Sequence, residues 1–207
     1  MSEKAFRPFI APETKMAEFT LKAVVTGSIF GVIFGASTVY HALKAGLTVS
    51  ASIPIAVMAI TLSRLFLKTT ILENNIIQTT GSAGESVAAG VVFTLPGFLF
   101  LSDPASEDYF SYLTILTLAV LGGILGVLMM IPLRRPLIVK EHETLPYPEG
   151  TACAAVLKAG EKGGDFAKTA FTGVGFALVY AFLQKIVHVI AETPSFMTKQ
   201  VNKFLPS

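Results

Sequence analysis

The hydrophobic pattern divides the chain into five long apolar segments that are separated by polar connections. These segments span residues 21–42, 49–67, 75–101, 112–132 and 169–190. Each is close to or above the length of about 20 residues that a helix needs to cross a bilayer. Their glycine, serine and threonine content favours packing against other helices over contact with lipid. The pattern predicts an all-α fold, a polytopic transmembrane helical bundle with about five membrane segments.

The third segment differs from the others because its first half is polar. That half contains Gln78, Thr79, Thr80, Ser82, Glu85 and Ser86. If a helix begins at Glu73, Glu85 lies about 18 Å further along it, near the middle of a hydrocarbon core about 30 Å thick. A carboxylate at that depth costs at least ~2.5–3.5 kcal/mol and normally marks an ion or substrate path. The residues that we expect to line such a path are Gln78, Thr79, Ser82, Gly84 and Glu85.

The same residues allow a second, structural interpretation. Ser82 and Glu85 have the spacing of a capping box, in which each side chain satisfies a backbone N–H at the start of a helix. Gly81 and Gly84 supply backbone freedom beside them. A cap at this depth means that a helix begins inside the membrane, so residues 75–101 are predicted to be broken or re-entrant. The sequence leaves open whether Glu85 carries a proton or only caps a helix.

Three glycines, Gly27, Gly31 and Gly35, recur every four residues in the first segment. Small residues at this spacing lie on one face of a helix and let a second helix approach closely. We therefore assign these glycines to helix packing.

The longest connection, residues 133–168, carries a motif of two prolines, a tyrosine, a glycine and a threonine. These residues are Pro146, Tyr147, Pro148, Gly150 and Thr151. The prolines favour extended backbone around the tyrosine, and the threonine suits the cap of a short helix over residues 152–159. Gly160 is expected to end that helix, which either lies at the membrane surface or enters the protein as a half-helix.

Composition supports a membrane protein and excludes several other classes. Of the 207 residues, 52% are hydrophobic and 14% are charged, against about 25% charged in soluble domains. A net charge of +2 without a basic strip argues against nucleic acid. A single cysteine and three scattered histidines provide no metal-ligand spacing. Because phosphate-loop and catalytic signatures are also missing, we expect neither a cofactor nor enzymatic activity.

The distribution of basic residues predicts the orientation in the cell membrane. If the N-terminus is cytoplasmic and the five segments alternate, 12 of the 16 lysines and arginines lie inside, as the positive-inside rule requires. The acidic loop of residues 102–109 then lies outside. This scheme makes residues 1–20 a cytoplasmic segment, residues 21–190 a transmembrane domain, and residues 191–207 a tail or the start of a continuation.

Three separated stretches together resemble the oligopeptide transporter (OPT) superfamily, including its bacterial and yellow-stripe-like branches. They are GASTVYHALKAGLTVSASIPIAV (35–57), NNIIQTTGSAGESVAAGVVFTLPGFLFL (74–101) and LPYPEGTACAAVL (145–157). The resemblance implies secondary, proton-coupled uptake of small peptides or metal–chelate complexes. It also implies more helices than five, so this chain is expected to be an N-terminal portion that is inactive by itself. The partners expected are the lipid bilayer, protons, the substrate, and the missing C-terminal part or another subunit.

Two other classes of function stay open at this point. The short length favours a non-catalytic membrane subunit that supports a larger partner. An intramembrane transferase is less well supported, because such enzymes need converging acids or an Asp-rich metal motif. Glu85 is the one acid that the pattern places deep in the membrane.

Overall fold

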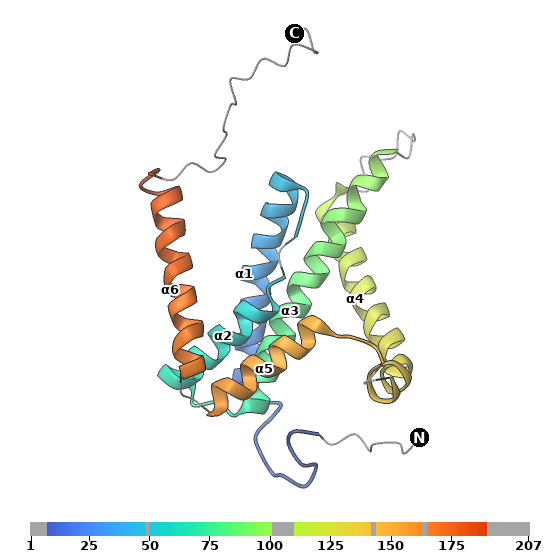
Figure 1. Cartoon of the computed structure of the whole chain (residues 1–207). Helices are drawn as coiled ribbons and strands as arrows, with labels where there is room; N and C mark the ends of the chain where they lie inside the picture. Colours follow the sequence, from blue (N-terminus) through green and yellow to red (C-terminus); the bar gives the residue numbers. More distant parts are fainter. Residues whose placement is uncertain (1–7, 49, 101–109, 142–143, 163–164, 190–207) are drawn as a thin grey trace, which may run out of the picture. The chain divides into compact units, whose positions relative to one another are not determined.

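The structure is a computed structural model that describes residues 8–48, 50–100, 110–141, 144–162 and 165–189. All regular elements among these residues are helices, which confirms the all-α fold (Figure 1). The chain forms two units, Met1–Gly163 and Gly164–Ser207, and each is treated by itself. The predicted outer loop at 102–109 and the predicted tail at 191–207 lie outside the described residues.

The first helix, α1 (Leu21–Ala45), has a capping residue at each end. The side chain of Thr20 accepts a hydrogen bond from the backbone N–H of Ala23, which satisfies one of the free donors of the first turn. Gly46 ends the helix in the left-handed conformation, with φ of 69°, and its N–H donates to the carbonyl of Ala42. Glycine adopts this conformation without steric cost, so the apolar pattern and the cap agree on where α1 ends.

A second long helix, α3 (Ile71–Thr94), begins with a capping box between Thr70 and Glu73. The buried carboxylate of Glu73 also accepts a hydrogen bond of 2.6 Å from Thr20 Oγ1. Lys22 Nζ lies 3.3 Å from the same carboxylate. These contacts join the start of α1 to the start of α3.

The glycines of the first segment lie where α1 and α3 meet. A Cβ atom placed on Gly27 would lie 2.7 Å from Cβ of Thr80, and one placed on Gly84 would lie 2.7 Å from Cα of Gly31. A Cβ atom on Gly35 would lie 3.4 Å from the carbonyl oxygen of Gly84. The two backbones are therefore in direct contact, and the contacts advance in the same direction along both helices, so α1 and α3 are parallel.

Because α1 and α3 are parallel, the chain must return after α1 to the end where α3 begins. It returns through a connection and a short helix. The α-helix α2 (Ser52–Leu62) has 11 residues and continues into a π-helix, Ser63–Leu67. Together they form the apolar helical run Ser52–Leu67, which is shorter than the length of about 20 residues that a spanning helix needs. Figure 1 shows the preceding connection running back beside α1 before α2 begins. Pro54 explains the late start, because its ring would clash with the carbonyl of Ser50 if the helix began earlier. The predicted 49–67 segment is thus the interrupted one.

The predicted break between Thr80 and Glu85 is wrong, because α3 runs through these residues as one α-helix. Ser82 caps no helix; its Oγ lies 2.7 Å from Oγ of Ser52. Gly81 provides room for packing instead of a break, since a Cβ atom there would lie 2.9 Å from Cδ1 of Ile55. Local sequence signals of a helix start are therefore overruled by contacts with α1 and α2.

After α3 the chain changes to a 3-10 helix, Leu95–Phe100, at the Pro-Gly pair that follows it. The next long helix is α4 (Tyr112–Arg134), which continues into a π-helix, Arg135–Lys140. In the described residues, two helices are long and apolar enough to cross a membrane, Leu21–Ala45 and Tyr112–Lys140. The number of five membrane segments stays a prediction.

The motif in the 133–168 connection forms a longer helix than its sequence predicts. The helix α5 runs over Pro148–Lys162, and its first turn includes a hydrogen bond of 2.9 Å from Thr151 N–H to the carbonyl of Tyr147. Thr151 is therefore inside the helix and is not its cap. Proline suits the first helical position because its missing N–H would have no partner there. Gly160 does not end the helix either, because α5 continues to Lys162. It packs against Ile60, whose side chain leaves no room for a Cβ atom at this position.

Two apolar clusters hold the first unit together. The first cluster joins α1, α2 and α3 and includes the residue before α2. Its members are Ala23, Phe30, Ala51, Ile55, Ala59 and Ile77. The second joins α2, α3 and α5 through Ala56, Ile60, Ile71 and Leu157. The short helix α2 contributes to both clusters, which places its N-terminus inside the packed bundle.

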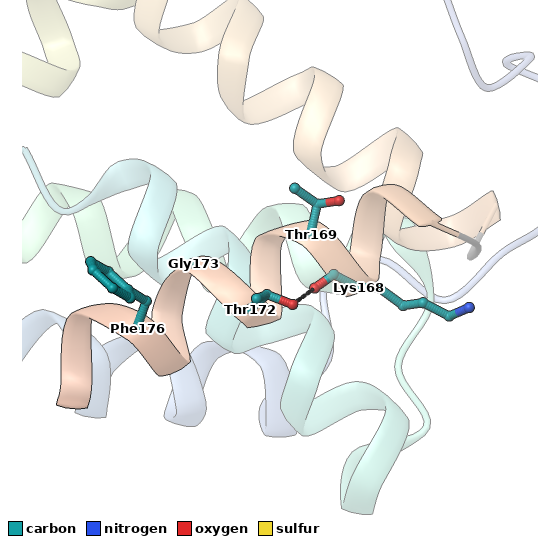
Figure 2. Close-up of a pocket in the computed structure, with 5 residues that line it drawn as sticks. All are labelled: Lys168, Thr169, Thr172, Gly173 and Phe176. Atoms are coloured by element: carbon teal, nitrogen blue, oxygen red, sulfur yellow. Dashed lines mark hydrogen bonds between the residues drawn. The ribbon is translucent and has the colours of Figure 1, made fainter.

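The second unit contains the helix α6 (Asp165–Lys185). Figure 2 shows a hollow along it, whose lining residues are Lys168, Thr169, Thr172, Gly173 and Phe176. The Oγ1 atom of Thr172 donates a hydrogen bond of 2.7 Å to the carbonyl of Lys168 within the helix. All the described lining comes from one helix, so this hollow does not bring chemistry from different elements together.

Candidate functional site

Polar side chains from four helices meet where α2 begins. Two serine hydroxyls lie 2.7 Å apart at the centre of this cluster. Ser52 stands at the start of α2, and Ser82 stands in the middle of α3. Ser52 is buried, with 6% of its surface exposed. Buried hydroxyls need hydrogen-bond partners, so this pair holds the start of α2 against α3.

Glu85 lies one turn further along α3, on the same side as Ser82. Its side chain is buried, with 7% exposed. The hydroxyl of Thr38, in α1, donates to its Oε1 over 3.5 Å, and the backbone N–H of Ala51 also interacts with the carboxylate. A free N–H at the start of a helix is a favourable partner for a negative group. Glu85 is thus held by weak partners from α1 and from the start of α2.

A second carboxylate, that of Glu149, approaches the start of α2 from α5. The hydroxyl of Ser50 donates to Glu149 Oε1, and Ser52 interacts with the same carboxylate. The hydrogen bonds from Ser50 and then from Ser52 hold the pKa of Glu149 below its ordinary value, because donors to a carboxylate favour its charged form. Glu149 is therefore ionised at neutral pH, and its exposed side chain faces solvent.

A pocket of about 380 Å³ lies between α2, α3 and α5 beside this cluster. Its lining consists of Ser52, Asn75, Gln78, Thr79, Glu149, Gly150, Cys153 and Ala154. Ser52, Gln78 and Cys153 are buried and form its floor. The other lining residues are exposed and form its rim. The lining has one carboxylate and no basic side chain among the described residues.

The floor of the pocket has spare hydrogen-bonding capacity. Gln78 is 7% exposed, and its Nε2 lies 3.8 Å from the sulfur of Cys153, a weak acceptor. Its amide oxygen makes no hydrogen bond within the described part of the chain. Burial, together with the charge of Glu149, raises the pKa of the Cys153 thiol, so this cysteine is neutral and a poor nucleophile at neutral pH.

The sequence-predicted path residues are partly brought together. Gln78 lines the pocket floor, and Thr79 lies at the rim with its hydroxyl bonded to the carbonyl of Asn75 over 2.9 Å. Ser82 and Glu85 lie in the cluster at the start of α2. Gly84 instead packs on α1 and does not line the pocket. Their role in a substrate or ion path stays a prediction.

The motif of the 133–168 connection contributes to the same place. Gly150 lines the pocket, and Pro146 and Pro148 lead the chain into α5. The hydroxyl of Tyr147 donates to the carbonyl of Leu137 over 2.9 Å, which fixes the chain before the helix. The motif thus positions the first turn of α5 at the pocket.

Sequence reasoning missed four residues of this cluster, namely Glu149, Ser52, Thr38 and Ser50, which donates to Glu149. Glu149 stands between the motif residues that were singled out, and its acidic side chain was the available signal. Ser52 could have been found from Pro54, which forces a helix start close to it. No local signal distinguishes Thr38, because it reaches Glu85 only through the packing of α1 on α3.

The cluster is rich in acceptors and acids, which suits protons and positively charged groups. Among the described residues no group of three or more histidine, cysteine, aspartate or glutamate side chains could hold a metal ion. The hydroxyl pair and the two carboxylates surround a helix start inside a bundle. That is a common construction for binding sites in membrane proteins.

Comparisons with known proteins agree on one family. The model of the OPT oligopeptide transporter protein family matches residues 18–205. A protein of Haemophilus influenzae named "Putative oligopeptide transporter" is 42% identical over 159 residues, which cover 75% of this chain and 24% of that protein. The chain thus spans about a quarter of the length of that relative. No solved structure matches the chain.

Proposed function

The chain belongs to the oligopeptide transporter (OPT) family, and from this premise we propose that it is the N-terminal portion of a secondary transporter. That transporter takes up oligopeptides across the cell membrane and is driven by protons. We propose oligopeptides and not metal–chelate complexes as the substrate, because the Haemophilus influenzae relative is named an oligopeptide transporter. The fold and the polar cluster support transport better than a transferase, because the described residues bring no catalytic constellation together.

One observation carries this proposal, namely the buried acid beside an interrupted segment. Glu85 is buried in α3 next to the start of the 11-residue helix α2. A carboxylate buried in a membrane bundle is costly and persists where it serves an ion or substrate path. Interrupted helices with their ends at such a site are typical of secondary transporters. Glu85 is the residue proposed to carry the proton.

A non-catalytic membrane subunit is the second candidate, and the exposed apolar surface of α4 favours it. The chain spans 24% of its relative, and α4 is exposed along its length in the structure. Exposed apolar helix faces in a membrane protein contact lipid or other helices. Under either proposal the transporting unit contains helices beyond those described.

Uptake by the complete transporter in liposomes tests the proposal. Labelled trialanine is offered outside, and a pH gradient, acidic outside, is imposed across the membrane. We expect accumulation above the equilibrium level, and we expect it to collapse when a protonophore removes the gradient. Equal accumulation with and without the gradient would rule out proton coupling. No accumulation of trialanine under any gradient would reject peptide transport and favour the subunit.

The orientation of the chain is proposed from its charges, with the N-terminus cytoplasmic. In a Cys153→Ala background, single cysteines are introduced as Ala105→Cys and Lys162→Cys. A membrane-impermeant maleimide applied to intact cells should label position 105 and leave position 162 unlabelled until the membrane is permeabilised. The reverse labelling pattern would invert the topology.

A further inference from the structure

The pocket between α2, α3 and α5 contains a negative charge and several hydrogen-bond acceptors that the surrounding protein does not fully use. Glu149 contributes an ionised carboxylate at the rim, and a carboxylate has about four acceptor positions, of which the two serines use part. Gln78 contributes an amide oxygen at the floor, and Asn75 contributes a second amide at the rim. A ligand that fits this pocket must supply hydrogen-bond donors and positive charge.

A primary ammonium group meets this requirement, since it has one positive charge, three donors and no acceptor. A bare metal ion fits less well, because the pocket lining provides one carboxylate and a neutral thiol. An anionic group would face Glu149 without a basic partner in the described lining. The chemistry therefore selects an ammonium group.

The size of the pocket limits how much of a ligand it holds. A volume of about 380 Å³ is near the lower end of the range of about 300–1,000 Å³ that is usual for small-molecule sites. It accommodates the end of a short peptide and not a long one, and the remaining residues of such a ligand extend past the exposed rim.

We propose that this pocket binds the amino end of the transported peptide, with Glu149 as the counter-ion of its ammonium group. Gln78 and Asn75 accept hydrogen bonds from the same group, and Ser50 and Ser52 hold the carboxylate in place. This inference rests on the proposed function, because it takes a peptide as the substrate. In this proposal the first turn of α5 recognises the free amino terminus of the peptide.

Binding to the complete transporter in detergent tests the assignment without requiring transport. The probes are trialanine, N-acetyl-trialanine and trialanine amide, and the dissociation constant is measured for each. Loss of one charge-assisted contact should weaken binding by about tenfold to a hundredfold. We expect this loss for the acetylated peptide and a smaller loss for the amide.

Two variants complete the test. In Glu149→Gln the affinity for trialanine should fall to that of the acetylated peptide, whose own affinity should stay the same. Glu161→Gln is the matched control, because Glu161 is an exposed acid near the other end of α5 that does not line the pocket. It should bind all three peptides as the unaltered protein does.

The outcomes separate this inference from the proposed function. If the unaltered protein binds trialanine and its acetylated form equally, the pocket does not read the amino end, whereas peptide binding stands. If Glu149→Gln weakens both peptides to the same extent, Glu149 has a structural role and the assignment is overturned. If the unaltered protein binds none of the three peptides, the proposed peptide substrate is rejected together with it.

Discussion

Replacing Gly84 with alanine should separate α1 from α3 and destabilise the protein severely. The added Cβ atom would lie 2.7 Å from Cα of Gly31 and 3.0 Å from its carbonyl carbon and oxygen. These are backbone atoms of a helix, so no side chain can rotate away to make room. Overpacking of this kind usually costs about 1–3 kcal/mol, and contact with a rigid backbone places Gly84→Ala at the upper end. Thermal unfolding of the purified protein measures the loss.

The chain offers a matched control on the same helix. Gly90 has no atom within 4 Å of where its Cβ would lie, and alanine is a better helix former than glycine. Gly90→Ala should therefore leave the unfolding temperature unchanged or raise it. Gly31→Ala is a second comparison. The nearest atoms to its added Cβ would lie 3.5 Å away, an ordinary distance, so this change should destabilise the protein less than Gly84→Ala. Equal stability of Gly84→Ala and Gly90→Ala would contradict the backbone contact between α1 and α3.

Replacing Glu85 with glutamine should abolish proton-driven uptake and leave the fold intact. Glutamine keeps the size of the side chain and an oxygen that accepts from Thr38, but it cannot release a proton. If Glu85 carries the coupled proton, uptake under a pH gradient should fall to the level measured without a gradient, because the variant has no ionisable group at this point of the ion path. Uptake of labelled trialanine into liposomes measures the effect.

Exchange of labelled for unlabelled peptide separates coupling from a general defect. Exchange needs no net proton movement, so Glu85→Gln should exchange peptide as the unaltered protein does. Glu161→Gln serves again as the control and should retain driven uptake. Normal pH-driven uptake by Glu85→Gln would remove this residue from the coupling mechanism. Loss of both driven uptake and exchange would show that the residue is needed for the site as a whole.

Much of the fold could be predicted from the sequence, because long apolar periods determine helices directly. The helices at Leu21–Ala45 and Tyr112–Arg134 lie close to the predicted segments. Such features depend on local propensity and chain length, which the sequence contains.

The location of the interrupted segment could not be predicted in this way. Ser82, Gly84 and Glu85 have the local signature of a helix start, but they lie inside a continuous helix. The glycines are present because α1 and α2 approach there, and such contacts join residues far apart in the chain. Pro54 was the more informative signal, because a proline restricts the backbone wherever it occurs.

The candidate site was predicted only in part, for a related reason. Gln78, Ser82 and Glu85 stand out because polar residues in an apolar segment are costly and visible. Glu149 lies in a polar connection, where an acid is unremarkable until α5 folds back onto α2. A residue is recognised from sequence when its own segment makes it unusual, and not when distant packing does so.

The backbone contact between α1 and α3 also restricts how the protein can move. Two helices whose glycine ridges interlock cannot slide along each other without losing that contact, so they must travel as one rigid body. Any bending within this part of the chain must therefore fall outside the α1–α3 pair.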